Sequence, residues 1–378
     1  MEVGVKGGST HSGVQTVLKS ARSWLVLILV VALFSINSTF RHTFFTQDYL
    51  PNIFEQSARN IVLAVGMSFV IFTGGIDLSV GSVLALCGVG LALSLSGQLP
   101  QWIVFVAVTP ITAAAVVGAY AGSRRHSQSV RAIACFIAGA IAELVGGFVV
   151  SRCVHGGIRL EGAIVICVMI GVACGLVNGL TSSLGRVPPF VVTLGMMSAA
   201  RGLTLYATDG ASVSARDYPR LLALGQPQVL VIAPLIVVLC GTAIIKWMKT
   251  GRYFLSIGGN EQASRLSGLN VAGNKTLAYI LAGICAAIGA ILVTAMFGQA
   301  STNAASGAEL EAIASVVIGG ASLTGGRGSI VGAMIGALTI TVITAGLILV
   351  QVPDTLQQVV LGAVIVATVL VDQTKQRA

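Results

Sequence analysis

Residues 163–185 read AIVICVMIGVACGLVNGLTSSLG, and no charged side chain interrupts this run. An α-helix needs about 20 apolar residues to cross a bilayer, so the run has the length and composition of a transmembrane helix. The whole chain is similar: 55% of its 378 residues are apolar and 9% are charged, whereas ordinary soluble domains hold about 25% charged residues. This composition excludes a soluble enzyme and a disordered chain. It predicts an all-α polytopic membrane protein.

Apolar runs on both sides of residues 163–185 predict about ten to twelve membrane segments in all. Two of them, 61–73 and 311–323, would form helices of only about 20 Å, so we expect broken or re-entrant helices buried among the others. The twelve candidates are 23–38, 61–73, 80–96, 102–122, 132–151, 163–185, 189–206, 229–247, 276–297, 311–323, 328–350 and 357–371.

The distribution of lysine and arginine predicts the orientation. With the N-terminus inside and every segment crossing, the inside loops and segment ends hold fifteen of the 22 Lys and Arg, and the outside loops hold six. The positive-inside rule therefore places both termini in the cytoplasm. It also accounts for the net charge of +9 without a nucleic-acid partner. We expect a tail over 1–22, one membrane domain over 23–371 and a tail over 372–378.

The sequence contains no pattern typical of a metal site, a catalytic site or a nucleotide site. Its seven cysteines form no CxxC and no Cys/His pair with metal spacing, and its four histidines lie far apart. The glycines at 268 and 273 approach a P-loop, but Asn274 occupies the position where that motif requires lysine. We therefore predict no catalytic residue, no metal and no cofactor bound by this chain.

Two regions of the chain echo each other. Residues 70–82 read VIFTGGIDLSVGS and residues 321–329 read ASLTGGRGS. In each, a short apolar segment reaches a Thr-Gly-Gly break, and a further segment follows. Paired breaks of this kind are typical of internal repeats around a transport pathway. Chance similarity is the alternative, because 46 of the 378 residues are glycine.

Two segments carry glycine at every fourth position, which places three glycines on one helix face. In membranes such faces allow close contact between helix backbones. The main prediction is therefore helix packing, and a role in helix sliding is the alternative. The six glycines are Gly171, Gly175, Gly179, Gly328, Gly332 and Gly336.

The polar segment 248–275 is the longest predicted cytoplasmic loop, and residues 258–268 within it read GGNEQASRLSG. Asn260 suits a helix N-cap, Glu261 suits the first turn and Gly268 suits the position after the helix. We expect a short surface helix, which is either an ordinary loop helix or a docking element for another protein. The candidate docking residues are Gly259, Asn260, Glu261, Arg265, Leu266 and Gly268.

Three motifs, in family order, resemble the membrane subunit of ribose-type monosaccharide ABC importers. They are TGGIDLSVGS at 73–82, GGNEQASRLSGLNV at 258–271, and ELEAIASVVIGG with SLTGGRG within 309–328. The similarity covers roughly 40–96 and 163–372. Three long matches in order are far more specific than one motif.

This resemblance implies a multi-pass permease of the bacterial inner membrane that imports monosaccharides or related small polyols. It implies three protein partners besides membrane lipid: an ATP-binding subunit with two nucleotide-binding domains, a second permease (identical or a sister subunit) and a periplasmic sugar-binding protein. The partner ATPase would use ATP and Mg²⁺, and 248–275 would be the coupling loop that contacts it. Family members usually have about ten segments, so 99–162 is expected to be an inserted hairpin that holds Glu143.

A sugar pathway requires hydroxyl-bearing and amide side chains inside the membrane. Asp77 has an alternative role as the cap of a helix that begins near Leu78, and Arg201 an alternative position at the outer interface. The candidates for the substrate pathway are Asp77, Ser79, Ser82, Asn178, Thr193 and Arg201.

A gradient-driven secondary transporter or facilitator is the alternative class of function. In that class, Glu143 or Asp77 would be the proton or sodium site, because charged groups inside membranes are expensive and often functional. The energy source of uptake distinguishes the two classes.

Overall fold

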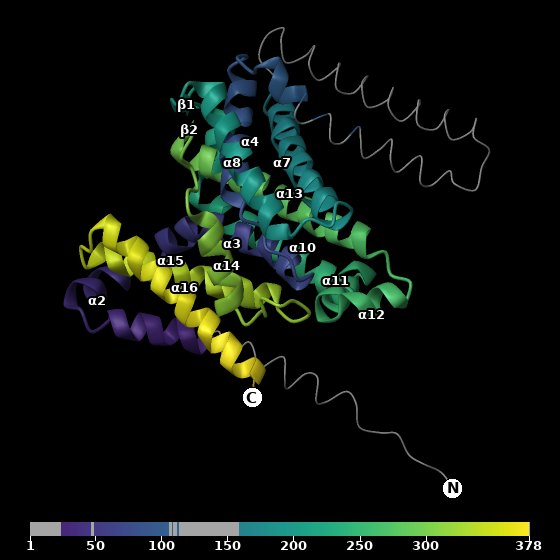
Figure 1. The fold of residues 1–378 in the computed structure, drawn as a ribbon. Helices are drawn as coiled ribbons and strands as arrows, with labels where there is room; N and C mark the ends of the chain where they lie inside the picture. Colours follow the sequence, from purple (N-terminus) through teal and green to yellow (C-terminus); the bar gives the residue numbers. More distant parts are fainter. Residues whose placement is uncertain (1–23, 47–48, 106–107, 109–111, 113–158, 378) are drawn as a thin grey trace.

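The computed structural model describes residues 24–46, 49–105, 108, 112 and 159–377. Most of the predicted inserted hairpin, including segment 132–151 and Glu143, lies outside the described residues. The described chain is almost entirely helical (Figure 1). After a helix over Trp24–Phe34, its elements are α2 (Ser38–Phe44), α3 (Tyr49–Phe72), α4 (Val80–Leu95), α7 (Leu160–Ser183), α8 (Pro189–Thr208), β1 (Val213–Ser214), α9 (Pro219–Leu222), the 3-10 helix η2 (Ala223–Gly225), α10 (Pro227–Trp247), α11 (Lys249–Gly259), α12 (Glu261–Leu266), α13 (Val271–Phe297), β2 (Gln299–Ala300), α14 (Ala308–Ile318), α15 (Ile330–Leu349) and α16 (Asp354–Arg377).

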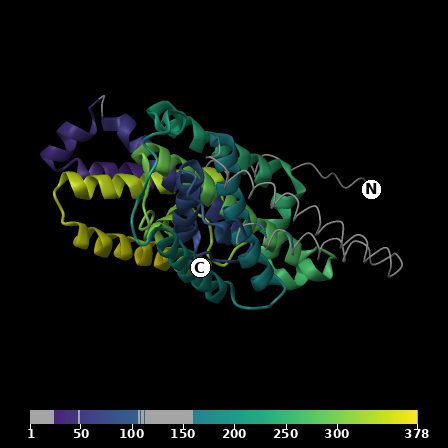
Figure 2. The same cartoon turned by 90° about the horizontal axis from the view of Figure 1, so that it is seen from above.

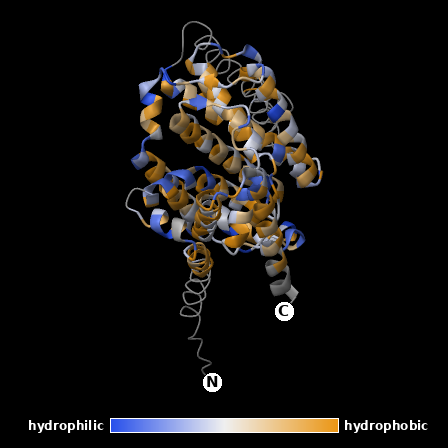
Figure 3. Cartoon of the chain, turned by 90° about the vertical axis from the view of Figure 1, so that its left-hand side faces the viewer, coloured by the Kyte–Doolittle hydropathy of each residue, from blue (hydrophilic) through white to orange (hydrophobic). Residues whose placement is uncertain are grey.

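Five of the described helices are long and apolar enough to cross a membrane: α7, α8, α10, α13 and α15. They coincide with predicted segments to within a few residues, and shorter apolar helices accompany them. Figure 3 shows that hydrophobic residues make up much of the helical chain. The predicted helical, polytopic architecture is confirmed, while the number of crossings and the side on which each terminus lies stay predictions.

The prediction of a short helix over 61–73 was wrong. Helix α3 begins at Tyr49 and has 24 residues, which is about 36 Å and long enough to span a bilayer. Its first half contains Arg59, one of the six arginines that the predicted orientation counts in the outside loops. The helix continues through these polar residues because distant side chains satisfy them: Arg59 pairs with Glu311. The other short segment is confirmed, since α14 has only 11 residues.

Helix α13 lies at the centre of the packing and contacts α3, α4 and α7. A smaller cluster forms where the helix over Trp24–Phe34 and α2 pack against α15 on one side of the molecule (Figures 1 and 2). There Phe40 and Phe44 of α2 stack with ring centroids 4.4 Å apart and pack near Val342 and Ala345 of α15. The predicted segment 23–38 ends at the first residue of α2, so this helix was not predicted.

The first predicted glycine face packs as expected. Gly171 and Gly175 of α7 lie against the backbone carbonyls of Gly283 and Tyr279 in α13. Contacts between backbones at this range leave no space for a β-carbon. The two long helices therefore approach each other through glycine, the arrangement that stabilises helix pairs in lipid. Gly179 continues the same contact one turn further along, at Thr276.

The second predicted glycine face needs a correction. Gly332 and Gly336 of α15 lie against the carbonyls of Gly319 and Ser315, so they form a packing face. Gly328, however, precedes α15, which begins at Ile330. Ser329 caps that helix by accepting from the N–H of Gly332. Gly328 therefore cannot share the helix face, and it contacts the ring of Phe72 instead.

The two ends of α13 define the two ends of the molecule. Its 27 residues extend about 40 Å, from α12 at one end to β2 at the other (Figure 1). At the β2 end, an antiparallel pair joins Val213 to Ala300 and Ser214 to Gln299. We call these the coupling end and the strand end. The predicted orientation places the coupling end in the cytoplasm.

Candidate functional site

The predicted surface helix in 248–275 is present as α12, and a second helix, α11, precedes it. Asn260 separates them and caps α12, because its Oδ1 accepts from the N–H of Ala263 at 2.8 Å. After the helix, Gly268 has φ +84°, a left-handed conformation that glycine adopts without strain. The predicted N-cap and terminating glycine are thus confirmed. Gly259, which we expected in a loop, is the last residue of α11.

Two ion pairs converge on Glu261, and one of them, with Lys275, holds α12 against the start of α13. The Nζ of Lys275 donates to Oε2 of Glu261 at 2.6 Å, and Nη2 of Arg265 donates to Oε1 at 3.1 Å. The hydrogen bond from Lys275 lowers the pKa of Glu261, and the charges of Lys275 and Arg265 lower it further, although partial burial acts in the opposite direction. Glu261 is therefore a carboxylate at neutral pH and links one turn of α12 to the membrane helix.

The pKa of Glu261 is lowered in the folded protein. The stability that its carboxylate contributes is therefore present at pH values above its ordinary pKa of 4.5, and it is lost as the pH falls through the lowered pKa. We expect the Glu261→Gln variant to exchange the amide hydrogens of 261–266 roughly two- to fivefold faster than the parent at pH 7. The difference should shrink as the pH falls below 4.5 and through the lowered pKa. Hydrogen–deuterium exchange mass spectrometry measures this, with Glu161→Gln as a control from a distant exposed pair. A difference that does not change as the pH falls would contradict the assignment.

The outward face of α12 is available to a partner. Leu266 is 83% exposed, and Asn260, Arg265 and Gly268 are exposed beside it. Ser264 is buried instead and lies 3.1 Å from the hydroxyl of Ser256 in α11. The two short helices therefore form one unit, with a polar surface around a single protruding leucine.

The backbone of this unit meets both Thr-Gly-Gly breaks at one place, which we call the glycine junction: Gly74, Gly258, Gly325 and Gly326. Gly258 lies between the carbonyl of Phe72 and the backbone of Gly325 and Gly326. The N–H of Gly326 donates to the Phe72 carbonyl at 3.1 Å. Gly74, Gly325 and Gly326 have φ values of +78°, +88° and +74°. The echoing regions are thus in contact, and α11 ends between them.

Asp77, Ser79 and Asn178 form a buried polar network. Both the N–H and the hydroxyl of Ser79 donate to Oδ1 of Asp77, at 2.8 and 2.6 Å, and Asn178 donates to the Ser79 hydroxyl at 2.9 Å. Helix α4 begins at Val80 with Ser79 as its cap residue. Asp77 therefore orients the residue at the helix start. We had expected Asp77 itself to cap a helix that begins near Leu78, but the helix begins two residues later and its cap residue is Ser79.

The remaining pathway candidates are also held by protein contacts. Ser82 and Thr193 are buried, and the Thr193 hydroxyl donates to the carbonyl of Pro189 at 3.0 Å. Arg201 donates to the carbonyl of Thr302, near the strand end, and its position toward the outer interface stays a prediction. One cavity of about 290 Å³ lies among the described residues, and none of the six predicted pathway residues lines it.

Sequence reasoning missed this cavity because its polar lining comes from several distant segments. One signal was available: the polar residues Glu55, Gln56, Arg59 and Asn60 directly precede an apolar run, and all four line the cavity. The prediction of a short helix over 61–73 left these four residues in a loop outside the predicted membrane segments.

Comparison with known proteins gives one family and several full-length relatives. Residues 49–369 match the family described as branched-chain amino acid transport system / permease component. A ribose import permease protein of Escherichia coli K12 is 35% identical, over 94% of this chain and 96% of that protein. The ribose import permease protein of Bacillus subtilis 168 is 33% identical (93% and 91%). The D-allose transport system permease protein of Escherichia coli K12 is 31% identical (93% and 90%). No solved structure matches the chain.

Proposed function

This chain belongs to the permease-component family of branched-chain amino acid transport systems, an integral inner-membrane family, and from that premise we propose that it is the membrane subunit of an ATP-driven importer of monosaccharides or related small polyols. The relatives named for ribose and allose cover more than nine-tenths of the chain. They favour a sugar over the amino acid in the family description. Its partners would be an ATP-binding subunit, a second permease and a periplasmic sugar-binding protein.

The glycine junction is the observation that carries this proposal. An exposed docking helix, α12, is joined through α11 to Gly258, which contacts the ends of α3 and of the α14–α15 connection. The end of α11 is packed against the backbones of α3 and of the α14–α15 connection. Because protein interiors are close-packed, α11 cannot move without displacing both. ATP-driven closure of the partner would move α12, and the junction would transmit that motion to both breaks. Alternating access of the membrane domain would follow.

The docking role of α12 is tested by co-purification. The Leu266→Asp variant is expected to lose at least nine-tenths of the ATP-binding subunit that co-purifies with the tagged parent in mild detergent. A charge placed at the centre of an apolar contact must be desolvated without a partner. Ser212→Asp, which adds the same group to an exposed position near β1, should retain the subunit. Normal recovery in both variants would contradict the docking role.

The same segment should control coupling. Replacing Arg265 by alanine or Glu261 by glutamine removes one or both ion pairs while leaving the buried face of α11 unchanged. We expect sugar uptake to fall more than ATP hydrolysis in both variants. Normal uptake in both would refute the assigned role.

Energy source separates this proposal from a gradient-driven transporter. Uptake that collapses on ATP depletion but survives dissipation of the proton and sodium gradients supports the ATP-driven class. The reverse result would move the function to a secondary transporter and would direct attention to Asp77 and Glu143.

A further inference from the structure

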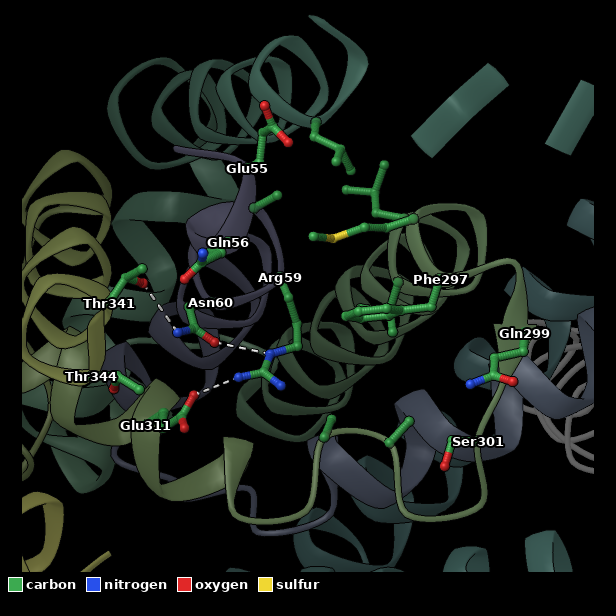
Figure 4. A pocket seen from close by; sticks show the side chains of 17 residues that line it. Glu55, Gln56, Arg59, Asn60, Phe297, Gln299, Ser301, Glu311, Thr341 and Thr344 are labelled. Atoms are coloured by element: carbon green, nitrogen blue, oxygen red, sulfur yellow. Dashed lines mark hydrogen bonds and ion pairs between the residues drawn. The ribbon is translucent and has the colours of Figure 1, made fainter. Parts of the chain in front are cut away.

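The cavity lies beside the first half of α3 and is bounded by α10, α13, α14 and α15 (Figure 4). Its volume of about 290 Å³ lies at the lower end of the range for pockets that hold small molecules, which begins at about 300 Å³. The cavity therefore has the size expected for one small polar solute.

An ion pair and an amide form one wall of the cavity (Figure 4). The Nη2 of Arg59 lies 2.7 Å from Oε2 of Glu311, and its Nε donates to Oδ1 of Asn60 at 3.0 Å. Asn60 in turn donates to the hydroxyl of Thr341 at 3.3 Å. Arg59 lies ten residues into α3, about 15 Å along the helix from Tyr49. Charged groups at such depth in a membrane domain are costly and mark functional sites.

Other polar side chains around the cavity have hydrogen-bonding groups that no described residue occupies. The Gln56 side chain is exposed and makes no hydrogen bond to any residue that the structure describes. The hydroxyl of Ser301 accepts from the N–H of Asn303 at 3.3 Å and retains its own donor. The ring of Phe297 is 58% exposed and lines the same cavity. Amides and hydroxyls that can donate and accept, beside an aromatic face, match the hydroxyl groups and C–H faces of a sugar.

The charges of the cavity favour an uncharged ligand. Arg59 is neutralised by Glu311, so neither is available to pair with a charged substrate without breaking a 2.7 Å contact. Glu55, the other charged lining residue, would repel an anion. An amino acid carries two opposite charges and would require free partners for both.

The cavity also lies toward the strand end. Phe297, Gln299 and Ser301 line it. Phe297 is the last residue of α13, at the end remote from α12, and the other two follow it. A solute that enters here would start on the side opposite the docking helix. An importer driven by an ATPase at the coupling end needs its substrate to enter from that side.

We infer that this cavity, between Gln56, Arg59, Phe297, Ser301 and Glu311, binds the monosaccharide when it first enters the membrane domain. The inference rests on the proposed function and extends it by naming the residues that receive the sugar. Gln56 and Ser301 contact the hydroxyls, Phe297 packs against the ring, and the Arg59–Glu311 pair forms the polar floor.

The first test measures uptake by the complete complex, with D-ribose and D-allose as probes. Gln56→Ala should lower the uptake rate about fivefold, the factor expected from the loss of one hydrogen bond. Gln228→Ala changes an exposed glutamine of α10 outside the cavity and should transport normally. Equal uptake in the two variants would argue against the site.

The second test reports occupancy without transport. A Ser301→Cys variant is treated with a membrane-impermeant thiol reagent in the assembled complex, and labelling of the parent is subtracted. Saturating D-ribose or D-allose should slow modification at least threefold, whereas L-leucine should not. Protection by L-leucine alone would overturn the sugar assignment, and protection by neither probe would overturn the site. Loss of ATP dependence in the parent would instead refute the proposed function, whatever the labelling shows.

Discussion

Gly258→Ala is expected to abolish sugar uptake, although it adds a single methyl group. A β-carbon at Gly258 would overlap the carbonyl oxygen of Phe72 and the amide nitrogen of Gly326, and it would lie 3.0 Å from the Cα of Gly325. All three obstacles are backbone, so no side-chain rotation relieves the overlap. The end of α11 must move away, and the contact between α12 and the two breaks is lost.

The neighbouring residue is a matched control for this prediction. A β-carbon at Gly259 would meet nothing within 4 Å, so Gly259→Ala makes the same chemical change in the same helix turn without an overlap. We expect Gly259→Ala to retain most of the uptake and Gly258→Ala to retain less than about a tenth, a difference equivalent to at least 1.4 kcal/mol. Radiolabelled ribose uptake, with membrane expression measured in parallel, tests this. Comparable transport in the two variants would show that the junction does not couple the segments.

Gly175→Val is expected to disrupt the membrane domain itself. The added β-carbon would overlap the carbonyl of Tyr279 and lie 2.9 Å from the Cα of Ile280 in α13. Overpacking costs typically about 1–3 kcal/mol, and here the two helices must separate along the contact that Gly171 and Gly283 maintain. The midpoint of thermal unfolding in detergent should fall by roughly 5–10 °C, with loss of the monodisperse peak in size-exclusion chromatography.

Gly362→Val provides the comparison for that stability loss. Gly362 lies in α16, and a β-carbon added there would meet no atom within 4 Å. The variant therefore changes the helix propensity as Gly175→Val does, but without the steric overlap. It should unfold within about 2 °C of the parent. A similar fall in both variants would assign the effect to valine in a helix and would remove the argument for α7–α13 packing.

Local features of this protein were readable from the sequence because neighbouring residues determine them. Continuous apolar runs predicted α7, α13 and α15, since a membrane helix must satisfy its own backbone hydrogen bonds. The Asn260 cap and the turn at Gly268 were also predicted correctly, because both depend on contacts within a few residues.

The start of α3 could not be read in this way. Polar residues before an apolar run usually mark the end of a membrane segment. Here Arg59 and Asn60 continue the helix because their partners, Glu311 and Thr341, lie 252 and 281 positions away. Only the folded chain supplies those partners.

The sequence by itself determined the class of protein, the positions of its apolar helices and the family motifs, because composition and local pattern are sufficient for each. The tertiary structure decided which of these motifs touch. Gly74, Gly258 and Gly325 are far apart along the chain and meet at one junction, and the cavity forms from segments of five helices. Such contacts depend on the way in which the long helices pack against each other. That packing follows from the shapes of surfaces far apart in the sequence, which no local pattern encodes.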